Sequence, residues 1–414
     1  MKITKNIDRK ILSNYIYLML LQGANFLLPL IILPYLVKVL GLEKFGVVMI
    51  AASFITFFNI LVDFGFNISA TREVSLIRED KEQLSRFFWT VLFIKLVLIL
   101  IGFALLLLLV YLIPKFRQEA WVYLFSFGIV IGQALFPAWF FQGIEKMRVI
   151  TIVNVTAKLI FTILIFLLIK RQEQYVYVPV LNSLGFIIAG LMGLLMSFKY
   201  ISLRKPLKND MNKLVKDSAF LFVSNFSTNL YTSANTFILG MFAGDYLAGI
   251  YASMEKLIIA VKSMYVPFYQ AVFPWLSRKT NTEKVGFIHR IRPFVIAAGL
   301  GISLLILLFS DRILQLIYHK PEIVSYANVF RILGFIALFA GLGMMYVSLL
   351  FPAVKLYKER MKVMITGGII NIVLAGILVQ FFNIYGVAIS AVTTEFLLFV
   401  MAHRIFKQKV SIHS

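Results

Sequence analysis

Long apolar runs alternate with short charged connections along the whole chain. Runs of about 20 apolar residues can cross a bilayer as helices, and most of these runs are apolar around the entire helix, as lipid-facing spans are. No connection is long enough to hold a separate soluble domain. The pattern therefore predicts an all-α integral membrane protein with twelve transmembrane helices. The expected spans lie near residues 14–37, 46–70, 87–113, 120–141, 149–169, 176–198, 217–240, 247–275, 291–310, 325–351, 363–382 and 384–403.

Composition supports a membrane protein and excludes several kinds of site. Hydrophobic residues make up 60% of the 414 residues and charged residues 14%, against about 45–50% and 25% in soluble domains. The chain has no cysteine, which excludes disulfides and cysteine-based metal centres. Its four histidines show no metal-ligand spacing, so no metal and no cofactor is expected. The basic N-terminus leads into an apolar run that is too long for a signal peptide, so we expect an uncleaved first helix.

The distribution of Lys and Arg predicts the orientation in the membrane. With the N-terminus inside, 28 basic residues fall in inside segments and 8 in outside loops. Basic residues are enriched in cytoplasmic loops, so both termini and the basic loop 199–216 are predicted to be cytoplasmic. The net charge of +22 is then mainly a topology signal, and no nucleic-acid partner is expected.

Two pairs of short, similar segments indicate an internal repeat. The pentapeptide EKMRV (145–149) is nearly repeated as ERMKV (359–363), and both lie at predicted inside junctions. The outside turns GLEKFG (41–46) and GDYLAG (244–249) both place glycines five residues apart. Because six spans separate the members of each pair, the halves enter the membrane from the same side, which predicts parallel repeats with a site between them. The expected domains are a six-helix bundle over 1–198, a cytoplasmic linker over 199–216 and a second six-helix bundle over 217–414.

Several short motifs in the first five spans are similar to those of a known protein family. They include LPYLVKVLGLEKFG, DFGFNISATRE and FPAWFFQGIEKMRVI. In these motifs the chain resembles the Wzx-type polysaccharide and O-antigen flippases of the multidrug/oligosaccharidyl-lipid/polysaccharide exporter superfamily. The matching positions are Leu33, Pro34, Tyr35, Gly41, Phe45, Gly46, Asp63, Phe64, Gly65, Phe66, Arg72, Glu73, Trp139, Gln142, Gly143, Glu145 and Lys146.

The resemblance implies a fold, a substrate and a location. Two six-helix bundles would form a V around a central cavity in the bacterial inner membrane. The protein would not be an enzyme: it would carry an oligosaccharide on undecaprenyl diphosphate from the cytoplasmic to the periplasmic leaflet by alternating access. Coupling to an inward gradient of protons or sodium, and association with a polysaccharide polymerase complex, are further expectations. The identity of the sugar stays open.

Ionisable residues inside the expected spans are the candidate site residues, because charge at membrane depth is costly. Two asparagines one helical turn apart in span 7 could bind sugar hydroxyls, although amides in membrane helices more often join helices. The substrate-binding candidates are Lys158, Lys256, Lys262, Arg331, Lys95, Glu255, Asn225 and Asn229. A positive excess in the cavity would suit a diphosphate. As alternatives, Lys95 could reach the inner headgroups and Arg331 the outer ones.

Span 8 and three acids complete the candidates. Tyr251, Glu255 and Lys262 share one helical stripe, which predicts a cavity-lining face and a local pair between Glu255 and Lys262. Glu395 and Asp63 are the ion-coupling candidates, and Asp63 could instead pair with Arg72.

Two other function classes compete with a flippase. A multidrug exporter of the same architecture would have an apolar, acid-lined cavity, whereas the spans hold five basic and three acidic residues. A membrane polymerase or glycosyltransferase would need a sizeable outer loop, and the longest one, near 310–324, is short.

Overall fold

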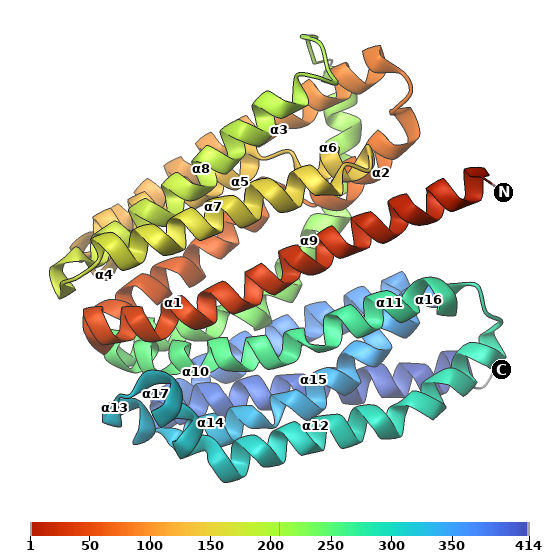
Figure 1. Cartoon of the computed structure of the whole chain (residues 1–414). Coiled ribbons are helices and arrows are strands. Elements are labelled where there is room, and N and C mark those ends of the chain that lie inside the picture. Colours follow the sequence, from red (N-terminus) through yellow and green to blue (C-terminus); the bar gives the residue numbers. More distant parts are fainter. Residues whose placement is uncertain (1, 207, 412–414) are drawn as a thin grey trace. The chain divides into compact units, whose positions relative to one another are not determined.

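Every regular element in the described part of the chain is a helix, as Figure 1 shows. This computed structural model describes the backbone of residues 2–206 and 208–411. Within them, side chains are described except at residues 2–22, 25–27, 208–210, 228, 230–232, 274 and 411. The prediction of an all-α membrane protein is confirmed.

The helices follow the apolar runs. In chain order they are α1 (Lys2–Asp63), α2 (Phe66–Ile77), α3 (Lys81–Leu112), α4 (Pro114–Gln118), α5 (Ala120–Leu135), α6 (Ala138–Gly143), α7 (Met147–Leu168), η1 (Gln172–Val176), α8 (Tyr177–Ser197), α9 (Lys208–Ala243), α10 (Asp245–Ser263), α11 (Tyr265–Ser277), α12 (Asn281–Tyr318), α13 (Pro321–Val324), α14 (Ala327–Gly334), α15 (Ile336–Met344), η2 (Met345–Leu350), α16 (Phe351–Ala353), α17 (Tyr357–Phe406) and η3 (Lys407–Ser411).

Eight helical stretches among the described residues are long and apolar enough to cross a membrane. Two of them, Leu28–Ile77 and Tyr357–Val410, are 50 and 54 residues long, more than twice the roughly 20 residues that one span needs. Each contains a backbone break, at Gly41 and at Asn383, where two helices meet. The expected spans near 217–240 and 247–275 lie outside these eight stretches, on α9 and on α10 and α11, and the number twelve itself stays a prediction.

The surface of several helices is apolar where lipid is expected. α3 exposes Phe93, Leu100 and Leu108, and α12 exposes Leu304 and Leu308. Exposed apolar side chains gathered along whole helices would be unfavourable in water. Such helices suit a lipid environment instead.

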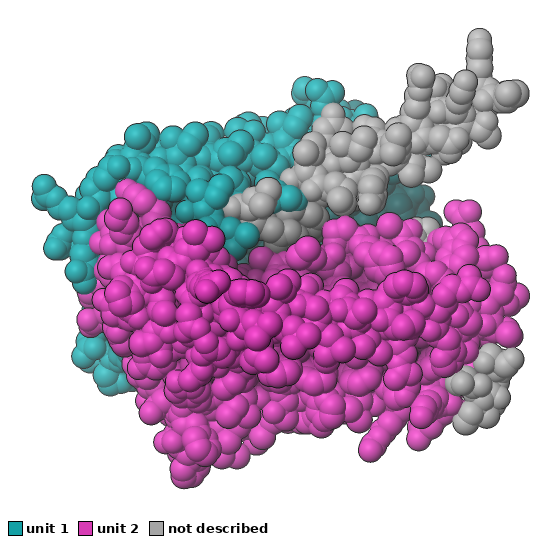
Figure 2. Space-filling view, turned by 60° about the horizontal axis from the view of Figure 1, so that its bottom comes forward, with its two compact units in different colours: residues 1–32, 51–226 teal, residues 33–50, 227–414 magenta. Residues whose placement is uncertain are grey.

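The described chain divides into two compact units, coloured separately in Figure 2. Unit 1 comprises residues 1–32 and 51–226, and unit 2 comprises residues 33–50 and 227–414. Residues 33–50 thus group with the C-terminal half, because the turn after Gly41 packs against the turn after Gly244. The expected linker 199–216 falls inside unit 1. The two six-helix bundles proposed from the sequence stay a prediction.

The two glycine turns are built alike. Gly41 (φ 71°, ψ 167°) and Gly244 (φ 92°, ψ 170°) both have backbone angles that favour glycine. Each lies directly before a helix that starts a new apolar run, and they are 203 residues apart. The backbone thus supports the internal repeat predicted from these turns.

The two charged pentapeptides are not equivalent, although both lie at turns of the same kind. Lys146 N–H donates to the Phe141 carbonyl (2.7 Å), and Leu356 N–H donates to the Phe351 carbonyl (2.8 Å). The residue before each donor has positive φ, Glu145 at 60° and Lys355 at 62°. The turns therefore align with an offset of 210 residues, whereas the pentapeptides are offset by 214.

The difference of four residues places the pentapeptides about one helical turn apart. Glu145 lies in its turn and pairs with Arg78 (2.7 Å). Glu359 lies in the first turn of α17 and pairs with Lys409. The two pentapeptides therefore do not occupy equivalent positions in their turns, and each acid binds a different neighbouring segment.

Candidate functional site

A cavity of about 340 Å³ lies inside unit 2, among α9, α10, α11, α14, α15 and α17. Half of its lining side chains are polar, in a part of the chain that is otherwise strongly apolar. The lining residues are Ser233, Asn235, Tyr251, Glu255, Ile258, Ile259, Lys262, Ser263, Val266, Leu333, Ile336, Met344, Ala391 and Glu395. Polar cavities between membrane helices are where transporters place their sites.

The predicted stripe on span 8 faces this cavity. Tyr251, Glu255 and Lys262 all line it from α10. Their spacing of four and seven residues places them on one side of the helix. The expectation that this stripe lines a cavity is confirmed.

The principal ion pair of the cavity joins α10 to α17. The Lys262 ammonium donates to the Glu395 carboxylate, and their side chains are 20% and 9% exposed. Glu255 instead accepts a hydrogen bond from the Thr236 hydroxyl of α9 (2.7 Å). The expected pair between Glu255 and Lys262 is therefore wrong: the carboxylate that approaches Lys262 comes from a different helix.

A buried network of amides and hydroxyls adjoins the cavity. The Asn371 side-chain amide donates to Asn235 Oδ1 (2.9 Å), and Asn371 Oδ1 accepts from Ser390 and Thr394 (both 3.3 Å). Asn371 precedes the break of α17 at Asn383, and the two hydroxyls follow it. The network thus holds both arms of α17 against α9.

Sequence reasoning missed most of this network. Asn371, Ser390 and Thr394 were not among the candidate residues. All three are buried in apolar helices, where an unpaired polar group would be costly. Their polarity was the only available signal, and it gives no partner.

The two asparagine candidates of span 7 lie outside this cavity. Asn225 and Asn229 are half-buried on α9, and neither lines the cavity. Lys256, also half-buried, follows Glu255 on α10 but does not line the cavity either. Their roles in substrate binding stay predictions.

Unit 1 contains a second buried pair, at the end of α1. Lys95 Nζ lies 3.4 Å from Asp63 Oδ1, and the Lys95 side chain is only 4% exposed. Directly after Asp63, Phe64 and Gly65 have positive φ and end the helix. Lys95 therefore does not reach for the headgroups, and Asp63 pairs with Lys95 rather than with the exposed Arg72.

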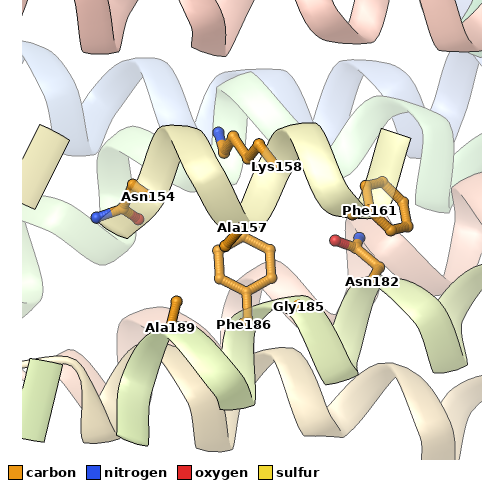
Figure 3. A pocket seen from close by; sticks show the side chains of 8 residues that line it. All are labelled: Asn154, Ala157, Lys158, Phe161, Asn182, Gly185, Phe186 and Ala189. Carbon is orange, nitrogen blue, oxygen red and sulfur yellow. The ribbon is translucent and has the colours of Figure 1, made fainter. Parts of the chain in front are cut away.

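Lys158 lies on α7, beside a small pocket between α7 and α8 (Figure 3). Asn154, Ala157 and Asn182 line this pocket with it. Figure 3 shows the Lys158 ammonium on the side of α7 away from α8. Its side chain is half-buried and lies near the middle of the apolar helix α7. An ordinary surface lysine would not be expected at this position.

Arg331 is held by protein partners. Its guanidinium pairs with Asp311 and donates to Asn328 Oδ1 and to the Leu307 carbonyl (3.2 Å). These contacts tie α14 to α12. Arg331 therefore has a structural role at this place, whatever it adds to substrate passage.

The charges of the cavity differ from the expectation. Three of the five cations inside spans, Lys95, Lys262 and Arg331, pair with carboxylates. The cavity itself holds two carboxylates and one lysine. It does not show the positive excess predicted for a diphosphate. Among the described residues, no three or more His, Cys, Asp or Glu side chains gather to hold a metal ion.

Comparisons with known proteins agree with this architecture. Two bacterial proteins named "Putative O-antigen transporter" are similar over nearly the whole chain. The one from Escherichia coli K12 is 27% identical over 92% of this chain and 93% of its own length. The one from Shigella dysenteriae is 28% identical over 93% of this chain and 97% of its own.

Solved structures show the same fold at low identity. An inward-facing multidrug resistance MATE transporter of the MOP superfamily matches with a TM-score of 0.71 and 13% identity, over 93% of this chain and 95% of that chain. A MOP superfamily transporter from Pyrococcus furiosus matches with a TM-score of 0.63 and 15% identity, over 97% and 95%. Residues 11–280 match the family described as "Polysaccharide biosynthesis protein". Because this match covers more than half of the sequence, the chain belongs to that family of membrane proteins.

Proposed function

We propose that this protein is a flippase for an oligosaccharide linked to undecaprenyl diphosphate, such as an O-antigen repeat unit. It moves this lipid from the cytoplasmic to the periplasmic leaflet of the bacterial inner membrane by alternating access. Both termini face the cytoplasm in this proposal. A polysaccharide polymerase complex is the protein partner expected beside the lipid-linked glycan.

The observation that carries the proposal is the family match together with two full-length relatives that bear O-antigen transporter names. The repeat of the glycine turns adds support, because parallel repeats are a transporter arrangement. The polar cavity in unit 2 adds support, because its hydroxyl, amide and charged groups could bind the polar part of a carried lipid.

A multidrug exporter is the second candidate, and one observation favours it. The cavity holds more carboxylates than cations, as a site for cationic drugs would. The MATE transporters share the fold at 13% identity, which says nothing of the substrate. The family match and the relatives' names outweigh this single feature.

Within the proposal, Glu395 and Asp63 are the ion-coupling groups, and each has a lysine partner. Sodium would need several oxygen ligands, and the lysine partner of each carboxylate cannot act as one, because an ammonium has no acceptor. A proton needs only one carboxylate oxygen. We therefore propose a proton rather than sodium as the coupling ion.

Deletion and complementation of the gene in its own bacterium test the function. We expect the deletion strain to lose surface polysaccharide and to accumulate the undecaprenyl-linked glycan, and the intact gene to restore both. Unchanged surface polysaccharide together with increased sensitivity to cationic drugs would point to the exporter instead.

A further inference from the structure

Four basic side chains converge at one end of unit 2, where α12 meets the end of α17. Arg292 and His289 come from α12, and His403 and Lys407 come from the α17–η3 junction. Arg292, Lys407 and His289 all lie close enough to act electrostatically on His403, and among the described residues no carboxylate does so. We call these four residues the basic cluster.

The guanidinium of Arg292 has a buried donor without an acceptor. Its Nε is inaccessible to solvent and makes no hydrogen bond with the described residues. Leaving a buried donor unpaired is unfavourable, and more so when the group is charged. An anion bound beside this guanidinium would offset the repulsion within the basic cluster and would compensate the unpaired buried donor through its charge.

Aromatic rings fix the imidazole of the basic cluster. The Tyr346 hydroxyl and His403 Nδ1 are hydrogen-bonded (3.0 Å). Phe399 stacks on the His403 ring with centroids 5.9 Å apart, and Phe406 packs against Tyr346. Arg292 also acts on Tyr346. A fixed imidazole and a partly buried guanidinium form a preorganised site rather than a loose surface patch.

The basic cluster is open to the surface on one side. His289 and Lys407 are exposed, whereas Arg292 and His403 are half-buried. A headgroup could therefore enter past His289 and Lys407 and meet the guanidinium of Arg292. The predicted topology puts this end of unit 2 at the cytoplasmic headgroups, where anionic lipids are concentrated.

We propose that the basic cluster binds the phosphate group of a membrane lipid. A guanidinium presents a planar fork of donors that matches phosphate oxygens, and charge-assisted bonds of this kind are the strong ones. Two lipids could supply the phosphate, an anionic phospholipid or the polyprenyl diphosphate of the glycan carrier. The phosphate site itself goes beyond the proposed function, and only the second source rests on it.

Binding of inorganic diphosphate to the purified full-length protein, measured by isothermal titration calorimetry, tests the site. Arg292→Gln should weaken binding by about ten-fold or more, because a charge-assisted bond is lost. Arg290→Gln is the matched control: Arg290 is exposed, lies two residues away and does not act on His403. It should change the affinity little. Arg292→Lys, which keeps the charge without the fork, should fall between the two.

Nanodiscs then separate the two lipid sources. If phosphatidylglycerol nanodiscs abolish diphosphate binding and phosphatidylcholine nanodiscs do not, a phospholipid headgroup occupies the site. If only undecaprenyl diphosphate competes, the carrier lipid does; both results support a phosphate site. Should Arg292→Gln fail to fold, the exposed Lys407→Gln carries the test with the same expected direction. The proposal is overturned if the wild type, the control and the Arg292 or Lys407 variant bind diphosphate with equal affinity. It is also overturned if the wild type does not bind diphosphate. Neither result affects the proposed transport function, which deletion and complementation test separately.

Discussion

Gly46 and Gly249 make a reciprocal backbone contact between the two halves of the sequence. A Cβ on Gly46 would lie 1.8 Å from the Asp245 carbonyl oxygen, and a Cβ on Gly249 would lie 2.1 Å from the Leu42 carbonyl oxygen. The offset of 203 residues that relates the two glycines also relates Leu42 to Asp245. Gly46 thus contacts Asp245, and its counterpart Gly249 contacts Leu42, the counterpart of Asp245. Contacts exchanged in this way are typical of a two-fold axis.

Alanine at either glycine should therefore separate the two turns. We expect Gly46→Ala and Gly249→Ala each to lower the free energy of unfolding by about 1–3 kcal/mol, the usual cost of overpacking. Thermal unfolding in detergent measures this effect. Gly301→Ala is the control, because nothing lies within 4 Å of its Cβ position. Loss of stability in the control alone would contradict the close approach.

The Lys262–Glu395 pair should be needed for transport beyond its effect on stability. Lys262→Gln leaves a nearly buried carboxylate without its partner, which costs up to about 3–5 kcal/mol; the 20% exposure of Lys262 favours the lower end. The double variant Lys262→Met, Glu395→Gln removes both charges and should regain most of the stability. It should still fail to export the glycan.

Lys279→Gln provides the comparison for this pair. Lys279 makes an exposed pair with Glu283 on the protein surface, so its loss should cost less than about 1 kcal/mol and leave export intact. Normal export by the stable double variant would show that the Lys262–Glu395 pair serves only the fold.

A double-mutant cycle should distinguish the two possible partners of Asp63. Lys95→Met should destabilise the protein strongly, and Asp63→Asn should then add little, because the two groups already interact. Arg72→Gln, at an exposed position, should change the free energy of unfolding by less than about 0.5 kcal/mol. Additive effects of the Lys95 and Asp63 changes would exclude the pair.

Single cysteines test the predicted orientation on a background without native cysteine. An impermeant thiol reagent added to whole cells should label Lys320→Cys and should not label Lys205→Cys. Labelling of position 205 from outside, with position 320 protected, would reverse the topology.

The sequence predicted the helical architecture and the glycine turns because both depend on local residue types. Apolar length determines spans, and a positive φ at Gly41 and Gly244 needs glycine. The stripe of Tyr251, Glu255 and Lys262 was also predictable from helical periodicity.

Partners across helices were not predictable in the same way. Lys262 and Glu395 are 133 residues apart, and only packing brings them together. The charged pentapeptides gave the wrong alignment of the two halves for a related reason. Their sequences match at an offset of 214 residues, whereas the turns match at an offset of 210. Short basic motifs recur at membrane junctions because basic residues are enriched in cytoplasmic loops. Their similarity in sequence therefore did not show which positions are structurally equivalent.

Reconstituted translocation tests the central proposal most directly. The purified protein is placed in liposomes that contain undecaprenyl-diphosphate-linked oligosaccharide, and an added glycosidase measures how much of the glycan is exposed outside. With wild-type protein, the initially protected fraction should become accessible, whereas protein-free liposomes and the Lys262→Met, Glu395→Gln variant should keep it protected. Protection that stays equal in wild-type and protein-free liposomes, with the protein folded, would contradict the flippase function.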